Sequence, residues 1–375
     1  MNKCVSRCAW LVSVIGISLS GVVTFAGDEH PSKVQGPQHQ AIGLNLNVPT
    51  PTLGGRQFWA DLRYFHDWRI QQNLFSKHCR LLDRNDIRQA WGTLEQCETR
   101  LEQIREERNL PEMKGEAVIL VHGIGLSSKS FSGMRTFLQN QGYPFAFSFD
   151  YPSTRVDIQT SAEFLHQTIS SLRGIERIHF VTHSLGGLIV RQYLARYHEP
   201  RVGRLVMLGT PNHGANLADW FRLTPPYYLI LGPAGQQLGA NADSYVWKLP
   251  VPRCEFGVIA GGRGPESPLQ SGLAAGFNPL IPGDDDTLVS VHSALLEGAT
   301  DSLVLPILHI ELPCNQTVKE HTARFLRDGR FRPKDEGPRQ PVLGPLMSTL
   351  PTRRAAGPTQ EVRATERNKP ESLSR

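Results

Sequence analysis

The sequence predicts an α/β fold in which a mostly parallel central sheet is flanked by helices, with an N-terminal helical extension. Short, fully apolar runs such as Ala117–Val121 are typical of strands that are buried on both faces. These runs alternate with helical patterns over residues 116–328, which is the order of a parallel sheet with helical crossovers. The length of 375 residues, with 39% hydrophobic and 20% charged residues, is sufficient for one large domain with extensions.

Strands and helices are expected to alternate within residues 111–331, the range that we assign to this domain. The expected strands are Ala117–Val121, Pro144–Phe149, Ile178–Thr182, Val202–Leu208, Glu255–Ala260 and Ser302–Leu308. The expected helices are Phe131–Gln141, Ile158–Leu172, Leu188–Tyr197 and Val318–Arg327. A parallel sheet covered by helices on both faces follows from this order.

The regions on either side of the domain differ from it in composition. Residues 27–55 are rich in Pro, Gly and Gln and predict a linker or surface arm. Residues 56–110 carry dense aromatic and aliphatic side chains, and within them residues 86–108 have the periodicity of an amphipathic helix. We expect 56–110 to be an N-terminal extension packed on the core, with a separate binding module as the alternative. Residues 332–375 are rich in Pro, Arg and Ser without periodicity, which predicts a disordered tail.

The first 26 residues have the layout of a secretory signal peptide. Lys3 and Arg7 precede an uncharged apolar run, Ala9–Ala26, and small residues at Thr24 and Ala26 are typical of a cleavage site. Residues 1–26 therefore predict export, to the periplasm or out of the cell. An uncleaved membrane anchor is the alternative, because about 18 apolar residues reach the lower limit for crossing a bilayer.

The cysteines and the net charge exclude some classes of partner. Cys79, Cys97, Cys254 and Cys314 follow the N-terminal segment, and an even number in an exported chain permits disulfides. Cys79 and Cys97 lie in one region and are able to pair, whereas buried free thiols are the alternative. Their spacing does not match a zinc site, so no metal is expected. The formal net charge of +5 comes without a basic patch interleaved with aromatics, so nucleic-acid binding is not expected.

Ser184 is the candidate nucleophile. It follows the strand Ile178–Thr182 and precedes Gly186, Gly187 and a helix. A serine at a strand-to-helix turn sits on strained backbone, and small neighbours are needed where the strand and the helix approach closely. The pattern Gly-x-Ser-x-Gly is met with Thr182 in its first position, where a small residue still suits the end of a strand. A structural serine in a turn is the alternative.

At this segment the chain resembles a lipase or esterase of the α/β-hydrolase superfamily, over about residues 115–328. Two further motifs support the resemblance, His122-Gly123-Ile124-Gly125 after the first strand and Leu208-Gly209-Thr210-Pro211 after the strand that follows the Ser184 helix. The resemblance implies an α/β-hydrolase fold with an oxyanion hole formed by the backbone N–H groups of Ile124 and Leu185. His122 is expected to brace that loop. The resemblance also implies that an insertion at residues 214–250 caps the site, with ordinary core as the alternative.

The resemblance implies that an acid and then a histidine follow the serine in the chain. Asp286 is the expected acid because an apolar residue and a valine follow it in the family's register; Asp285 is its rival. Calcium binding by the three consecutive aspartates is a further alternative. His309 directly follows the last strand and is favoured as the base over His321, which lies inside the closing helix. His183, next to the serine, is expected to be structural.

The sequence therefore predicts a serine hydrolase that cleaves carboxylic esters, lipase- or esterase-like, through Ser184, His309 and Asp286 and an acyl-enzyme. It needs no cofactor. The expected partner is a small-molecule or lipid ester, with membrane proximity through the N-terminal segment. Acyl transfer and amide hydrolysis use the same groups, and a non-catalytic binding protein of the cell envelope is the competing class. The natural substrate, its acyl-chain length and the oligomeric state stay open.

Overall fold

The computed structural model describes residues 50–51, 56–215, 218, 225–264, 276–337 and 339–340. The predicted signal peptide, most of the predicted linker and most of the predicted tail lie outside these residues. Within the described ranges, no helix combines the length and the apolar character needed to cross a membrane.

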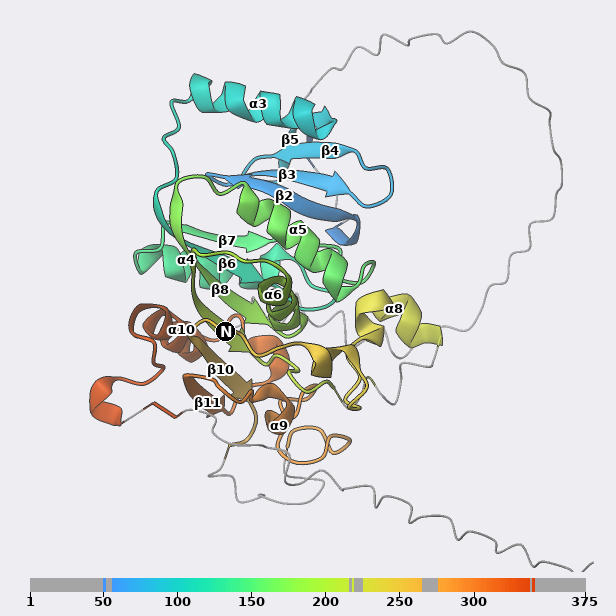
Figure 1. Ribbon diagram of the computed structural model, residues 1–375, viewed down its shortest axis with the longest axis vertical. Helices are drawn as coiled ribbons and strands as arrows, with labels where there is room; N and C mark the ends of the chain where they lie inside the picture. The colour runs from blue at the N-terminus through green and yellow to red at the C-terminus, as the bar shows by residue number, and fades with distance from the viewer. Residues whose placement is uncertain are drawn as a thin grey trace, which may run out of the picture. The chain divides into compact units, whose positions relative to one another are not determined.

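A six-stranded sheet in the order β11-β10-β9-β8-β6-β7 forms the centre of the molecule, and every neighbouring pair is parallel (Figure 1). Its strands are β6 (Gly115–Val121), β7 (Phe145–Phe149), β8 (Ile175–His183), β9 (Val202–Leu208), β10 (Phe256–Gly261) and β11 (Asp301–Leu305). The run Ala117–Val121 is buried throughout, as a strand with helices on both faces requires. The predicted parallel sheet is confirmed.

Helices cover both faces of this sheet, which confirms the predicted α/β class. On one face, buried side chains of α4 (Ser132–Asn140) and α10 (Gln316–Asp328) form one apolar cluster with Val181 and Val206 of the sheet. On the other face lie α6 (Leu185–Arg196) and α5 (Ile158–Ser170), which pack against each other. Successive residues of β8 point to opposite faces, so Val181 meets the first pair while Phe180 contacts Tyr193 of α6.

The strand order reverses beside β6. The chain passes from β6 to β7 on one side and then returns to β8 on the other side of β6. The loops that follow β6 and β8 therefore leave the sheet in opposite directions, and open α/β sheets place their sites at such a switch point. Ser184 and the His122-Gly123-Ile124-Gly125 motif follow these two strands.

Residues 50–51 and strands within 59–92 form a second sheet, which is antiparallel and has the order β1-β5-β4-β3-β2. Its strands are β1 (Thr50–Pro51), β2 (Trp59–Phe65), β3 (Trp68–Asn73), β4 (Cys79–Leu82) and β5 (Ile87–Gly92). Helix α3 (Leu94–Glu107) packs on β3, β4 and β5, and β2 packs against α5 (Figure 1). The short strand β1 falls within the range predicted as linker.

The prediction of a helical extension is therefore correct only for Leu94–Glu107, and the helix expected from residue 86 begins later. His66 and Asp67 both have positive φ, 43° and 70°, and form a two-residue hairpin turn between β2 and β3 without a glycine to signal it. At the other end, Thr93 caps α3. Its side chain accepts from the Gln96 backbone while the Gln96 side chain returns to the Thr93 backbone, so the helix cannot start earlier.

The second sheet is joined to the main domain by stacking and by buried hydrogen bonds. The ring of Tyr64 in β2 stacks on Phe147 of β7 at 3.7 Å between centroids, a contact worth about 0.5–1.5 kcal/mol beyond area burial. The amide of Asp61 donates to the carbonyl of Asp150 at 2.9 Å, and the amide of Asp150 donates to the Asp61 carboxylate at 2.7 Å. The residues after β7 are therefore held by the N-terminal sheet.

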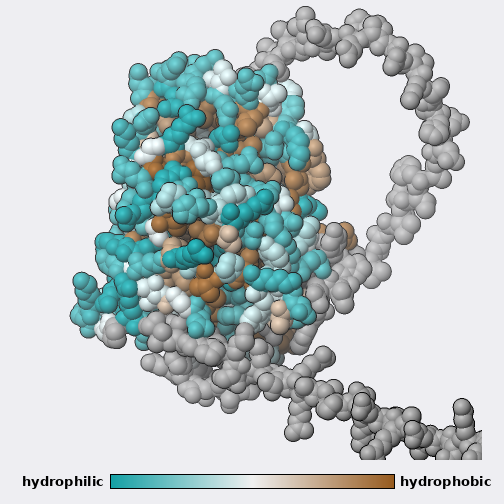
Figure 2. All heavy atoms as spheres, viewed as in Figure 1, coloured by the Kyte–Doolittle hydropathy of each residue, from teal (hydrophilic) through white to brown (hydrophobic). Residues whose placement is uncertain are grey.

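The insertion at 214–250 contains α8 (Pro225–Gln236) and a short 3-10 helix, η3 (Tyr245–Lys248). Gly232 interrupts α8 with a φ of 61°, and a side chain there would meet the Thr154 carbonyl at 1.9 Å. This part of the insertion therefore lies against the loop after β7. Leu229 and Ile230 are exposed, and apolar atoms reach the surface at α8 in Figure 2. The remaining aromatic side chains of the insertion, before Leu229, lie outside the described residues.

Candidate active site

Ser184 sits on strained backbone between β8 and α6. Its φ is 52° and its ψ is −124°, a region that costs a non-glycine residue about 1–3 kcal/mol. The turn is held because the Ser184 amide donates to the Leu208 carbonyl of the neighbouring strand at 2.9 Å. Thr182, which replaces the usual glycine, is buried, and its hydroxyl donates to the Val206 carbonyl at 3.2 Å. The departure from the motif is thus accommodated within the sheet.

The two glycines after the serine are required by close approach. A Cβ at Gly186 would lie 2.2 Å from the Val121 carbonyl oxygen and 2.8 Å from that of His122. A Cβ at Gly187 would lie 2.1 Å from the Thr210 hydroxyl. Helix α6 therefore starts directly against the end of β6 and against the Leu208-Gly209-Thr210-Pro211 motif.

We expect Gly186→Ala to destabilise the protein by about 1–3 kcal/mol, the usual cost of overpacking. The added methyl group would press on backbone atoms, which cannot move aside as a flexible side chain can. Thermal unfolding followed by circular dichroism measures the change. Gly133→Ala on α4 is the matched control, since a Cβ there meets only the end of the Lys319 side chain, at 3.4 Å. A melting temperature of Gly186→Ala equal to that of wild type would contradict this account.

His309 and Asp286 form a buried pair. Nδ1 of His309 lies 2.7 Å from Oδ2 of Asp286, and the His309 amide donates to the Asp286 carbonyl at 2.8 Å. The other carboxylate oxygen of Asp286 accepts from the amides of Leu288 and Val289 at 3.1 and 2.8 Å. A carboxylate can only accept here, so Nδ1 carries the proton and Nε2 is left as the basic nitrogen.

The pair lies beside the serine turn. Nε2 of His183, the residue before Ser184, is 3.0 Å from the His309 carbonyl, and the two rings are 4.7 Å apart between centroids. Burial lowers the pKa of His183 well below its ordinary value, so this ring is neutral and donates from Nε2. A Cβ at Gly209 would lie 3.1 Å from both His309 Nδ1 and Asp286 Oδ2. The predicted base and acid thus meet at the carboxyl edge of the sheet, where Ser184 lies.

The alternative residues are engaged elsewhere. Asp285 accepts from the amides of Asn278 and Thr287 at 3.0 and 2.7 Å, and Asp284 accepts from the amides of Arg263 and Gly264. These two aspartates organise loops, and each faces backbone N–H groups instead of a shared centre. Within the described residues, no group of three His, Cys, Asp or Glu is arranged to hold a metal ion. His321, on α10, has its Nδ1 2.8 Å from the Phe331 carbonyl.

The loop after β6 lies against the serine. A Cβ at Gly123 would be 3.0 Å from the Cβ of Ser184. Further along this loop, the Gly125 amide donates to the Ser153 hydroxyl at 3.0 Å. In the part of the chain that the structure describes, neither the Ile124 amide nor the Leu185 amide has a hydrogen-bond partner. Both predicted oxyanion donors are thus available beside the serine.

The ring of His122 braces this loop. Its Nδ1 lies 2.8 Å from the Gly123 carbonyl, and it stacks on Tyr151 with 4.3 Å between centroids. The Tyr151 hydroxyl donates to the His122 carbonyl at 2.5 Å. Burial lowers the pKa of His122 despite the nearby Asp150, so the ring is neutral. A neutral, stacked imidazole fits a structural role.

Sequence reasoning missed the polar groups behind this loop, which are Gln57, Asp61, Arg69 and Asp150. Asp61 and Asp150 are buried, whereas Asp is almost never fully buried unless it is paired. The signal was present in the sequence as charges at inward positions of the aromatic stretch, but the pairing partners come from strands far apart in the chain.

Cys79 of β4 and Cys97 of α3 are free thiols. Cys79 and Cys97 are both buried, and burial raises the pKa of Cys97 to about 12. Buried free thiols, the alternative to a Cys79–Cys97 disulfide, are therefore what the structure shows for these two residues. Cys254 is also free.

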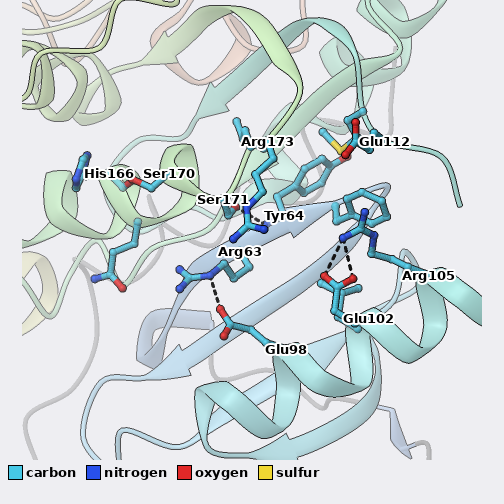
Figure 3. A pocket seen from close by; sticks show the side chains of 15 residues that line it. Arg63, Tyr64, Glu98, Glu102, Arg105, Glu112, His166, Ser170, Ser171 and Arg173 are labelled. Carbon is cyan, nitrogen blue, oxygen red and sulfur yellow. Dashed lines mark hydrogen bonds and ion pairs between the residues drawn. The ribbon is translucent and has the colours of Figure 1, made fainter.

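A cavity of about 830 Å³ lies between β2, α3 and α5 (Figure 3). Its charged side chains are largely paired with each other. Arg63 binds Glu98 at 2.6 Å, and Arg105 binds Glu102 at 2.8 Å. The site residues are not among those that line it, so this cavity is separate from the candidate active site.

Comparisons with known proteins give the following similarities. The family described as "Domain of unknown function (DUF7379)" matches residues 79–226, a range that starts in β4 and includes Ser184. A search of curated proteins found no match.

Solved structures of several lipases and esterases are similar at low identity. A phospholipase from Legionella pneumophila, solved with thio-NAD, is 19% identical with a TM-score of 0.38, over 48% of this chain and 44% of its own. A mature lipase from Bacillus licheniformis is 22% identical with a TM-score of 0.41, over 58% and 93%. A metagenomic carboxyl esterase is 20% identical with a TM-score of 0.39, over 54% and 66%. This chain therefore spans less than half the length of the Legionella phospholipase. A shared fold does not specify a reaction, which depends on the site residues.

Proposed function

We propose that this protein is a serine hydrolase that cleaves carboxylic esters through Ser184, His309 and Asp286. The observation that carries the proposal is the buried His309–Asp286 pair beside a serine held at φ 52° at the same sheet edge. A neutral serine hydroxyl needs a base, a group that orients the base, and oxyanion donors. Each has a matching group at this edge.

In the proposed reaction, the Ser184 hydroxyl transfers its proton to Nε2 of His309 as its oxygen bonds to the ester carbonyl carbon. Asp286 holds the imidazole by Nδ1 and stabilises the imidazolium that forms. The amides of Ile124 and Leu185 stabilise the negative carbonyl oxygen. Collapse of this intermediate breaks the bond to the alcohol, which leaves with the proton from His309. Water then repeats the sequence on the acyl-enzyme and regenerates the serine.

The proposed substrate is an ester with an apolar acyl chain. Leu229 and Ile230 on α8 are exposed, and this helix lies against Thr154 in the loop after β7. The neighbouring residue, Ser153, accepts a hydrogen bond from the Gly125 amide of the oxyanion loop. An apolar surface beside a hydrolytic site favours lipid-like chains. We also propose that the protein is exported or membrane-anchored, since the uncharged run Ala9–Ala26 supports a position at the cell envelope.

A fluorophosphonate probe tests the proposal. Such a probe reacts with an activated serine and mimics the tetrahedral intermediate, so we expect covalent labelling of the native protein and loss of the label on denaturation beforehand. Peptide mass mapping should place the adduct on Ser184. Hydrolysis of p-nitrophenyl esters of increasing chain length then measures the acyl preference. A native protein that neither takes the label nor hydrolyses any of these esters would refute the proposal.

A further inference from the structure

The N-terminal sheet reaches the loop that carries the predicted oxyanion donors. Gln57, in the 3-10 turn η1 (Arg56–Phe58) before β2, donates from Nε2 to the Leu126 carbonyl at 2.9 Å. Its Oε1 accepts from the Thr154 amide and hydroxyl, both at 3.0 Å. The Leu126 carbonyl can only accept and the Thr154 amide can only donate, so the orientation of the Gln57 amide is fixed by its partners.

A second bond passes from Gln57 to the loop through Ser153. The Ser153 hydroxyl donates to Oε1 of Gln57 at 3.1 Å and accepts from the Gly125 amide at 3.0 Å. The Gln57 side chain is thus bonded to Leu126 directly and to Gly125 through the Ser153 hydroxyl. Ile124, the predicted donor, is the residue before Gly125.

The far end of the loop is held by the same sheet. The amide and the hydroxyl of Ser128 both donate to the Asp150 carboxylate, each at 2.7 Å. Arg69 of β3 binds that carboxylate at 2.9 Å, and Asp61 of β2 accepts from the Asp150 amide. Burial opposes the ionisation of Asp150, but Arg69 and the Ser128 bonds hold its pKa below the ordinary range. The carboxylate is therefore a charged acceptor that anchors Ser128.

Simple docking of the sheet does not require these contacts. The stacking of Tyr64 on Phe147 and the bond from the Asp61 amide to the Asp150 carbonyl already join the two parts. Gln57 adds bonds at the one loop whose backbone N–H groups must stay fixed for an oxyanion hole to work. Donors act there by preorganisation, so a loosely held loop loses stabilisation of the transition state.

We propose that the N-terminal sheet positions the oxyanion loop, residues 122–128, and that Gln57 is the positioning residue through which it does so. The inference rests on the proposed function. The N-terminal sheet then acts on catalysis through the position of this loop.

Gln57→Ala in the full chain tests this. We expect kcat to fall about 10- to 100-fold with little change in KM, since a misplacement of about 1 Å costs up to about 100-fold. Active-site titration with the fluorophosphonate normalises kcat to correctly folded protein. Gln57→Glu keeps the size of the side chain but puts an oxygen against the Leu126 carbonyl, so we expect a similar loss. Hydrogen exchange at the Gly125 amide should become faster in both variants.

Gln72→Ala is the matched control. Gln72 lies in β3 of the N-terminal sheet, and its Nε2 donates to the Lys77 carbonyl at 3.3 Å, away from the oxyanion loop. We expect its kcat and its Gly125 exchange to equal those of wild type. The proposal is overturned if kcat per titrated site in Gln57→Ala matches wild type, or if Gln72→Ala loses as much activity. Failure of the proposed function shows separately, as wild-type protein that is not labelled at Ser184; Gly125 exchange still tests the positioning of the loop in that case.

Discussion

Ser184→Ala is expected to lower kcat/KM for p-nitrophenyl esters by about 10⁴-fold or more, the usual cost of removing the nucleophile of a triad. Without the hydroxyl no acyl-enzyme forms, and only the binding groups and the oxyanion donors assist attack by water. Initial rates with purified protein measure the effect. The melting temperature should stay at the wild-type value, because alanine keeps the same strained backbone and the bond from the residue 184 amide to Leu208.

Ser170→Ala is a suitable control for this experiment. Ser170 lies on α5, where its hydroxyl donates to the His166 carbonyl at 2.8 Å, and we expect its loss to leave the rate unchanged. Equal rates for wild type and Ser184→Ala would mean that the hydrolysis has another origin, and the proposed function would then be wrong.

His309→Ala is expected to cause a loss of similar size, whereas His321→Ala should keep kcat/KM near that of wild type. Of these two histidines, His309 is the one that pairs with a buried carboxylate beside the serine turn. His321 contacts the Phe331 carbonyl, so its removal should cost about 1 kcal/mol of stability, the worth of one hydrogen bond. Steady-state kinetics and thermal unfolding of both variants separate the two effects.

The reverse result for these two histidines would change the assignment of the base. If His321→Ala abolishes hydrolysis while His309→Ala retains it, the base has been assigned to the wrong residue. Loss of activity in both variants together with a lower melting temperature in both would point to misfolding. Far-UV circular dichroism of each variant at the assay temperature measures the folded fraction independently of the serine's reactivity and removes that ambiguity.

The sequence predicted the central domain well because its signals are local. A strand buried on both faces must be a short apolar run, and the runs at Ala117–Val121 and Ile178–Thr182 lie within β6 and β8. Ser184 was singled out by the strand before it and the glycines after it. The close approach of Gly186 to the Val121 carbonyl is the physical reason for that pattern.

The N-terminal region was predicted less well because its pattern has no single period. Aromatic and charged residues are mixed there, and the hairpin turn at His66 and Asp67 has positive φ without a glycine. A strand is stabilised by partners across the sheet, which a one-dimensional pattern does not contain. The helix expected over residues 86–108 from its periodicity begins only at Leu94, where Thr93 and Gln96 form a local cap.

The sequence by itself determined the parallel sheet and the position of Ser184 at the turn after a strand, because both depend on hydrophobic runs, glycines and spacing within a few residues. The order of serine, acid and histidine is what the family resemblance implies. Only the tertiary structure decided that His309 faces Asp286 while His321 faces Phe331, because the partner of a buried side chain depends on what packs around it. It alone brought Gln57 to Leu126, since a contact across 69 residues of chain depends on how the two sheets pack.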